Sequence, residues 1–252
     1  MTRFPLRLCS LGAALALLLS ACAPEADTVP AATLGQAKTV GIISAIGDKF
    51  SSITTTFENQ PAERYGIDAY AIGLVKDRLA GRYSVQPVKY DVVEFGPDRA
   101  ELPDTGLFTP GDPLGAVIRA HASPSDLDLY IVLMKGMTKV ENGNRALHGL
   151  GLIRGGDLFT TKYWVHATYS VIVVDGHTGE VLANNSAIDN AHPFDLLDPP
   201  DLPGPFVAVD ASFWPEDIEH VPADKMERLA ETLKPLLART LPDTMRAMKL
   251  AP

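Results

Sequence analysis

Polar residues that could bind a ligand or assist hydrolysis follow the first strongly apolar segment of the domain. Lys38–Gly47 is almost continuously apolar and rich in β-branched residues, which predicts a strand buried on both faces. Asp48, Ser51 and Ser52 come after it and predict a polar loop. Ligands of open α/β sheets collect beyond the carboxyl ends of parallel strands, so this loop is a candidate site for a small ligand or a hydrolysable substrate. A turn or loop cap is the alternative role for Asp48.

The sequence lacks the spaced motifs of common catalytic and metal sites. Ser44 lies inside the predicted strand and not in a G-x-S-x-G elbow. Gly149–Gly156 departs from a dinucleotide fingerprint, because Arg154 occupies the third glycine position and a strand-like segment follows, so it predicts a hairpin or loop. The six histidines form no i, i+4 pair, and the aspartates of Phe194–Asp201 lack the ligand spacing of a calcium loop. We therefore expect no catalytic residue, metal site or noncovalent cofactor.

The first 21 residues have the organisation of a secretory signal. Arg3 and Arg7 precede an apolar run from Leu8 to Leu19, and the small residues Ser20 and Ala21 follow. The run of about a dozen residues is shorter than the roughly 18 to 20 that a membrane-spanning helix needs. We therefore expect residues 1–21 to be removed.

The four residues Leu19–Cys22 resemble the lipobox of bacterial lipoproteins. The resemblance implies cleavage before Cys22, a thioether-linked diacylglycerol on its sulfur and an acyl chain on its new amino group. In these families the residue after the cysteine helps to select the membrane, and Ala23 in place of Asp implies export to the outer membrane, facing the periplasm. An ordinary signal peptide cut after Ala21 is the alternative.

The charge of the processed chain disfavours two classes of partner. Residues 1–21 contain two basic residues and no acidic one, so their removal takes the formal net charge from −9 to about −11. Nucleic acid binding needs a basic footprint, and direct adsorption to anionic lipid heads is disfavoured for the same reason. With Cys9 removed and Cys22 lipidated, no disulfide forms, so stability must come from a hydrophobic core, which the 46 % hydrophobic residues can supply.

The pattern of residues divides the processed chain into a tether and a domain. Residues 22–37 are rich in Ala, Pro and small polar side chains without apolar periodicity, which predicts a flexible tether for the lipid. An ordered strap along the domain is the alternative. Residues 38–250 predict one periplasmic α/β domain.

Two βαβ crossovers, an antiparallel hairpin and a C-terminal helix give the domain a predicted mixed sheet. Pro87 predicts an irregularity in the second strand, and Pro235 and Pro242 predict a kinked or interrupted final helix. A long irregular excursion is expected over residues 190–222. The expected elements are strands at Lys38–Gly47, Tyr83–Phe95 and Leu127–Gly136, helices at Gly66–Arg82, Leu114–Ala122 and Ala223–Leu250, and a hairpin over Thr161–Ala187.

This order of elements resembles the periplasmic α/β domain of envelope lipoproteins, with its sharpest local similarity at Val171–Leu182 ("VIVVDGHTGEVL"). Examples are the curli-secretion lipoprotein and the amino-terminal domain of the Tol translocation protein. The resemblance implies a membrane-anchored protein that binds or assembles with another envelope protein. Phe213 and Trp214, in the proline-rich excursion, are the expected partner contacts if they are exposed. A periplasmic hydrolase and a small-ligand binding lipoprotein, each with a site near Asp48, are the alternatives.

Overall fold

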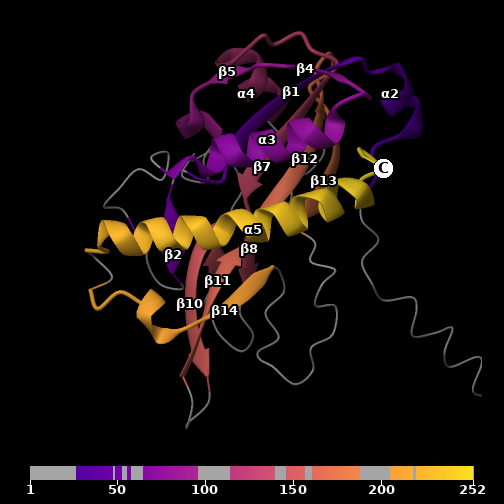
Figure 1. The fold of residues 1–252 in the computed structure, drawn as a ribbon. Coiled ribbons are helices and arrows are strands. Elements are labelled where there is room, and N and C mark those ends of the chain that lie inside the picture. Colours follow the sequence, from indigo (N-terminus) through magenta and orange to yellow (C-terminus); the bar gives the residue numbers. More distant parts are fainter. Residues whose placement is uncertain are drawn as a thin grey trace, which may run out of the picture.

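Two five-stranded β-sheets form the framework of the protein (Figure 1). The computed structural model describes residues 27–47, 49–52, 56–57, 65–95, 114–139, 146–156, 161–187, 205–217 and 220–251. The first sheet has the strand order β13 (Val181–Ser186), β12 (Tyr169–Asp175), β7 (Leu129–Lys135), β1 (Thr39–Ala45) and β4 (Ser84–Gln86). The second has the order β14 (Phe206–Val209), β11 (Thr161–Ala167), β10 (Leu150–Gly156), β2 (Phe50–Ser52) and β3 (Thr56–Phe57).

The first sheet is mixed, as the sequence predicts. β1 is parallel to both β4 and β7, whereas β12 is antiparallel to β7 and to β13. The turn at residues 176–180 joins β12 to β13 as the predicted hairpin. The prediction of a single α/β domain with βαβ crossovers, a hairpin and a C-terminal helix is therefore confirmed.

The two crossover helices cover opposite faces of the first sheet. α3 (Ile67–Leu79) follows β1 and packs in one core together with the C-terminal helix α5 (Ala223–Ala247). α4 (Leu114–His121) lies between β4 and β7 in the chain and packs in a second core on the other face. Residues of β1 alternate between these cores, with Ile42 in the first and Ile43 in the second. Burial on both faces explains the continuous apolar sequence of this strand.

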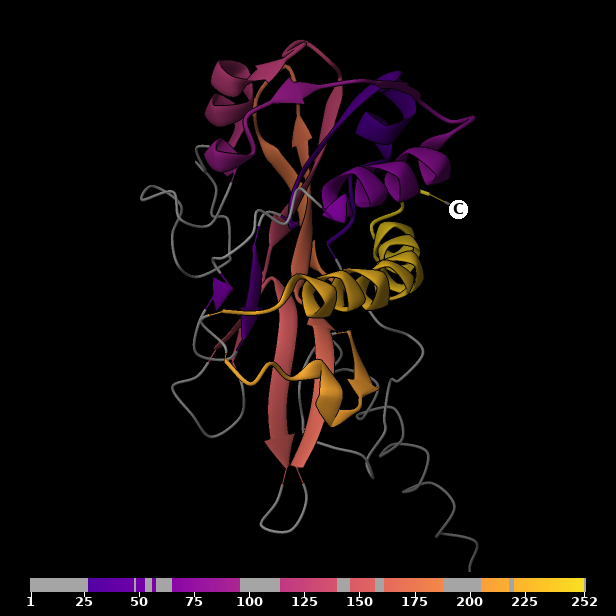
Figure 2. The ribbon, with the colours of Figure 1, turned by 60° about the vertical axis from the view of Figure 1, so that its left-hand side comes forward.

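The second sheet was not predicted as a separate sheet, because its strands continue the chain of the first. β11 ends at Ala167 and β12 begins at Tyr169, so the chain passes from one sheet to the other with Thr168 alone between them. The Thr168 N–H donates to the Gly149 carbonyl at 2.8 Å, and its carbonyl accepts from the Gly136 N–H at 3.0 Å. Figure 2 shows the long strands running from one end of the molecule to the other. A sequence pattern records strand character but not the sheet to which a strand belongs.

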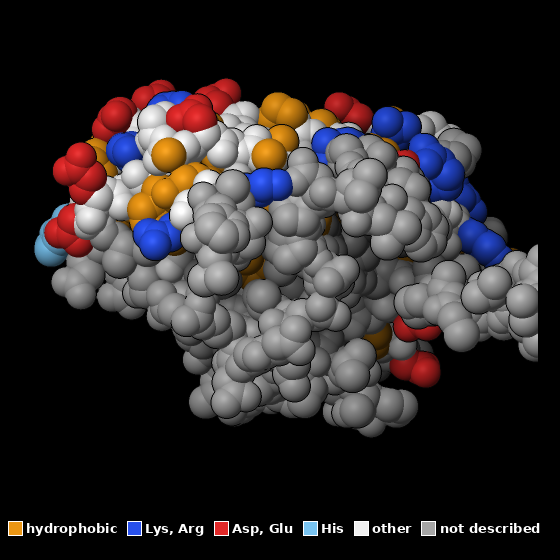
Figure 3. Space-filling view, turned by 90° about the horizontal axis from the view of Figure 1, so that it is seen from below, with side chains coloured by type: hydrophobic (Ala, Val, Ile, Leu, Met, Phe, Trp, Pro, Cys, Tyr) orange, Lys and Arg blue, Asp and Glu red, His pale blue; other side chains and the backbone are white. Residues whose placement is uncertain are grey.

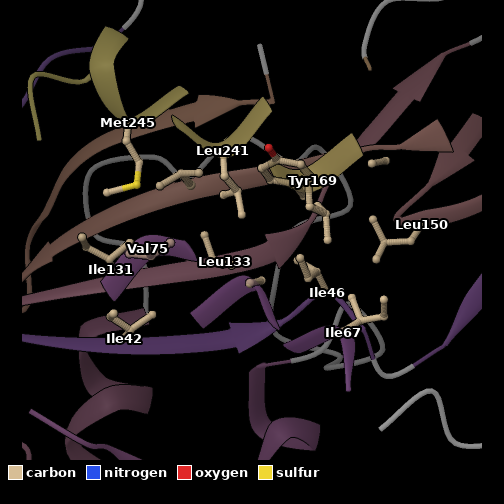
Figure 4. Packing of buried hydrophobic residues seen from close by; sticks show 14 of the residues in the cluster. Ile42, Ile46, Ile67, Val75, Ile131, Leu133, Leu150, Tyr169, Leu241 and Met245 are labelled. Atoms are coloured by element: carbon tan, nitrogen blue, oxygen red, sulfur yellow. The ribbon is translucent and has the colours of Figure 1, made fainter. Parts of the chain in front are cut away.

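Both sheets share one hydrophobic core beneath α5 (Figure 4). Ile131 from β7, Leu150 from β10 and Leu241 from α5 belong to the same buried cluster. α5 remains one continuous helix through Pro235 and Pro242, and its axis bends in Figure 2. The helix is therefore bent, as predicted, and not interrupted, because the buried leucines of its apolar face hold it on the core.

Residues 27–37 of the predicted tether lie on the domain. α2 (Ala31–Gln36) begins after Pro30, and the side chains of Val29 and Leu34 are buried in the shared core. The Val29 N–H donates to the Met248 carbonyl at 3.3 Å, and Asp27 exchanges two backbone hydrogen bonds with the side chain of Asn185. Residues 27–37 are thus an ordered strap, and residues 22–26 lie outside the described ranges.

The remaining described elements are short. The predicted strand at Tyr83–Phe95 is divided at Pro87 into β4 and β5 (Lys89–Tyr90), followed by a 3-10 turn, η2 (Val92–Phe95). This confirms the predicted irregularity. Part of the predicted irregular excursion forms β14 and a second 3-10 turn, η3 (Ala211–Phe213). Short pairs are made by β5 with β6 (Ala122–Ser123) and by β8 (Met137–Lys139) with β9 (Ala146–His148).

Candidate functional site

The residues predicted to form a polar loop are in a strand instead. Ser51 and Ser52 belong to β2, which pairs in parallel with β10, and both side chains are buried. The Ser51 hydroxyl donates to the carbonyl of His148. Gly151 lies directly against the Ser51 carbonyl, where a Cβ atom would clash with the backbone, so glycine lets the strands approach. Asp48 lies outside the described residues.

An open pocket of about 430 Å³ lies instead at the carboxyl end of β1, lined by Ser44, Asp68, Tyr90, Asp91 and Val92. β1 lies between β4 and β7, and the crossover from β1 to β4 and the crossover from β4 to β7 pass over opposite faces of the sheet, through α3 and α4 respectively. The pocket is therefore at a topological switch point, the position at which open α/β sheets bind ligands. Sequence reasoning identified this edge of the sheet but not Asp68 or Tyr90, which join it from α3 and β5.

The polar groups of this pocket are held by hydrogen bonds among themselves. The Ser44 hydroxyl donates to the Asp68 Oδ1 atom at 2.5 Å, and the same oxygen accepts from the Ile46 N–H at 3.0 Å. The Gly47 N–H lies 3.2 Å from both Asp68 oxygens. A Cβ atom on Gly47 would come within 2.8 Å of Ile67, so glycine allows this close contact between strand end and helix. Asp68 thereby fixes α3 to the end of β1.

Tyr90 forms part of the pocket wall and hydrogen-bonds the edge of β1 that β4 leaves without a strand partner. β4 pairs with β1 only as far as Gly41. Beyond that point the Tyr90 hydroxyl accepts from the Ser44 N–H at 3.1 Å and donates to the Ser44 carbonyl at 2.9 Å. These bonds satisfy backbone groups at the strand edge.

The surroundings of Ser44 do not activate its hydroxyl as a nucleophile. A nucleophilic serine needs a basic partner that can accept its proton, and the carboxylate beside Ser44 already accepts backbone N–H bonds that stabilise its charged form. The side chain of Ser44 is also fully buried. The pocket can receive a ligand, and its exposed acid is Asp91, whose Oδ1 atom accepts from the Val93 N–H.

A second surface feature surrounds Phe213 and Trp214. Both side chains are partly exposed and pack against the edge of the shared core. The Trp214 ring lies 5.9 Å from the Tyr163 ring of β11, and the guanidinium of Arg154 on β10 lies 5.9 Å from the Trp214 centroid. The Arg228 guanidinium of α5 stacks over the Phe213 ring at 4.2 Å. We call these five side chains the aromatic–arginine surface.

Polar contacts fix the backbone of this surface. The Lys225 ammonium donates to the carbonyls of Ser212 and Trp214 at 2.6 and 3.0 Å. Asp210 caps η3 through the Ser212 N–H at 2.8 Å, and hydrogen bonding to Ser212 lowers the pKa of the Asp210 carboxyl. Figure 3 shows hydrophobic side chains interspersed with charged ones at the upper left of the view. Sequence reasoning found the two aromatic residues but missed Arg154, Tyr163 and Arg228, which come from three other elements.

Other chemical groups in the described part of the chain do not assemble into a metal site. No group of three or more His, Cys, Asp or Glu side chains gathers among these residues. His166 on β11 is buried, and desolvation lowers the pKa of its imidazole to about 4. Of the helices that the structure describes, none is both long and apolar enough to cross a bilayer.

The fold therefore defines a mixed α/β protein with a long C-terminal helix across two sheets. No protein-family model matches the sequence, and no curated protein matches it. Four chains of solved structures match. One of them is a PelC dodecamer from Paraburkholderia phytofirmans, which is 11 % identical, covers 84 % of this chain and 95 % of its own, and superposes with a TM-score of 0.28.

Proposed function

We propose that the protein is a lipoprotein of the bacterial cell envelope that is anchored through Cys22 and binds another envelope protein through the aromatic–arginine surface. The anchor rests on the signal-like residues 1–21 and the lipobox resemblance at Leu19–Cys22. Export to the outer membrane, with the domain facing the periplasm, follows from Ala23 by the same resemblance.

The observation that carries the binding role is the partial exposure of Trp214 within a prearranged cluster. Large aromatic side chains flanked by arginine are the residue types that dominate protein interfaces. The stacking of Trp214 on Tyr163 and the Lys225 bonds to the Trp214 backbone reduce the conformational entropy that binding must remove. Arg154 is exposed, so the partner that fits presents an apolar side chain next to a carboxylate.

Crosslinking in intact cells tests this role. We expect the native chain to capture one dominant envelope protein and Trp214→Ala to reduce that capture about tenfold or more, because a central aromatic anchor carries much of an interface energy. Val93→Ala is the matched control, since Val93 is a hydrophobic residue that is 73 % exposed elsewhere on the domain. Capture that is equal in native chain and Trp214→Ala, with both chains folded, contradicts the role of this surface.

Binding of a small ligand is a second candidate function, favoured by the pocket at the carboxyl end of β1. The exposed Asp91 carboxylate makes amine-bearing compounds the first class to screen, by the shift in melting temperature of the processed chain. Asp91→Asn should remove a shift that arises in this pocket. A shift that persists in Asp91→Asn places the ligand elsewhere.

A further inference from the structure

The strap limits how far the domain can lie from a lipid on Cys22. The ordered chain is fixed at Asp27 by its hydrogen bonds to Asn185 and again at Val29 by the bond to Met248. The five residues of chain from Cys22 to Asp27 span at most about 18 Å, even when fully extended. A lipid anchor on Cys22 therefore holds the start of the strap close to the headgroups.

Basic side chains lie beside the point where the strap meets the domain. The Arg82 guanidinium donates to the carbonyls of Lys249 and Leu250 at 3.1 and 3.2 Å, and Met248 is the residue that binds the strap. Arg78 lies in the last turn of α3, and Lys38 precedes β1, where its carbonyl accepts from the Ser84 N–H. We call Lys38, Arg78, Arg82 and Lys249 the basic rim; all four are exposed.

The basic rim stands out because the protein as a whole carries a formal net charge of −9. A row of Lys and Arg side chains is visible at the right of Figure 3, the side on which the C-terminus lies in Figure 1. Arg246 in the same part of α5 is paired with Asp243 at 2.6 Å and adds no net charge. Asp27 on the strap, Asp77 on α3 and Asp128, which accepts from the Lys38 N–H, are acidic residues near the rim, and the four basic side chains outnumber them.

We propose that the basic rim docks on the anionic phospholipid headgroups of the membrane that holds the Cys22 lipid, so that the domain has a fixed orientation on that membrane. The inference rests on the proposed lipid anchor. It explains how an acidic protein can lie against an anionic surface: the lipid supplies proximity, and the basic rim is the part of the domain that is attracted at short range. The attraction acts within a Debye length, and a reach of at most about 18 Å from Cys22 to Asp27 allows the rim to approach the headgroups that closely.

Chemical footprinting of the lysine amines tests the orientation in the full processed lipoprotein. The protein is reconstituted into vesicles of phosphatidylcholine alone or with about 30 % phosphatidylglycerol, and acetylation of each lysine is followed by mass spectrometry. We expect the Lys249 amine to react about threefold or more slowly on the anionic vesicles, because headgroups cover it, and salt at about 0.5 M to remove the difference. Lys234, elsewhere on α5, is the internal reference and should react equally on both vesicles.

Two matched variants separate docking from a general effect of charge. Arg78→Glu should abolish most of the protection of Lys249, whereas Arg154→Glu, on the second sheet, should leave it intact. Equal acetylation of Lys249 on the two vesicle types overturns the inference, as does an equal loss of protection in both variants. Failure of the anchor is recognised separately, because the chain then fails to float with either vesicle and its amino-terminal peptide lacks acyl mass.

Discussion

At the scale of single residues, Asp128 joins three parts of the first sheet. Its Oδ2 atom accepts from the N–H groups of Lys38 and Thr39 at 2.8 and 2.9 Å, and its Oδ1 atom lies 3.1 Å from the His177 imidazole in the β12–β13 turn. The backbone N–H bonds of Lys38 and Thr39 hold the pKa of the Asp128 carboxyl well below its usual range. The ionised carboxylate therefore stabilises the start of β1.

Replacing this carboxylate should destabilise the fold. We expect Asp128→Ala to lower the free energy of unfolding by about 2 to 3 kcal/mol, because two strand-end N–H groups lose a charged acceptor. Asp128→Asn keeps one oxygen acceptor and should lose less. Urea denaturation near pH 7 measures both values. The native contribution is present above the ordinary carboxyl pKa of 3.8 and declines as the pH falls below it. Equal stability of native chain and Asp128→Ala would contradict this role.

His166 should make stability depend on pH in a different range. Its folded pKa is about 4 because burial penalises the charged imidazole, whereas an exposed histidine in the unfolded chain titrates near 6.5. As the pH falls from about 6.5 to 4, the unfolded state gains a proton that the folded state does not, so the free energy of unfolding falls, by about 3 kcal/mol in all. His166→Phe should flatten this slope, as measured by urea denaturation at each pH. An unchanged slope in His166→Phe would contradict this role of the buried imidazole.

At the scale of elements, the strap shows that a short segment of unremarkable composition can be part of the core. Leu34 is buried with 7 % of its surface exposed, and Leu34→Ala should cost about 2 to 3 kcal/mol of unfolding free energy. Gln36→Ala, at an exposed position of the same helix, should have an effect near zero. Urea denaturation of the two variants provides the test. Equal stabilities would mean that α2 does not contribute to the folded core.

The sequence predicted those elements whose local pattern agrees with their final environment. β1 and β7 are buried on both faces and have continuous apolar sequences. The hairpin turn has Gly179 at a φ of 78° and Gly176 at a point where a Cβ atom would clash with the Leu127 carbonyl. The strap was predicted only as the alternative to a flexible tether, because two buried side chains, Val29 and Leu34, are too few to show a periodic pattern. The second sheet was missed because pairing is decided by contacts distant in the sequence.

Some of the residues of each candidate site were named from the sequence, and the others were not. Phe213 and Trp214 were found because aromatic residues in a proline-rich segment have no strand or helix period to explain them. Their partners Arg154, Tyr163 and Arg228 come from strands and a helix with ordinary patterns, so only the fold brings them together. The pocket was expected at the end of β1, but Tyr90 reaches it from a two-residue strand that no periodicity reveals.

At the scale of the whole molecule, the proposed anchor decides where the domain acts. Cys22→Ala should remain an uncleaved precursor without lipid, because the resemblance at Leu19–Cys22 implies that lipid attachment to the cysteine precedes cleavage. Metabolic labelling with a fatty acid, followed by the mass of the amino-terminal peptide, measures both effects. Ser20→Ala keeps a small residue in the same segment and should be processed normally. Normal labelling of Cys22→Ala would contradict the anchor.

The contact between Val29 and Met248 has a consequence for the timing of folding. The first described turn of the chain is bound by a residue close to its last one, and α5 supplies the leucines that cover both sheets. Domains whose contacts are local can form while synthesis is still in progress. Here the bond from Val29 to Met248 can form only when the residues that follow α5 have been made and, if the chain is exported, have emerged on the far side. The amino-terminal strap should therefore be among the last parts to become protected from proteases.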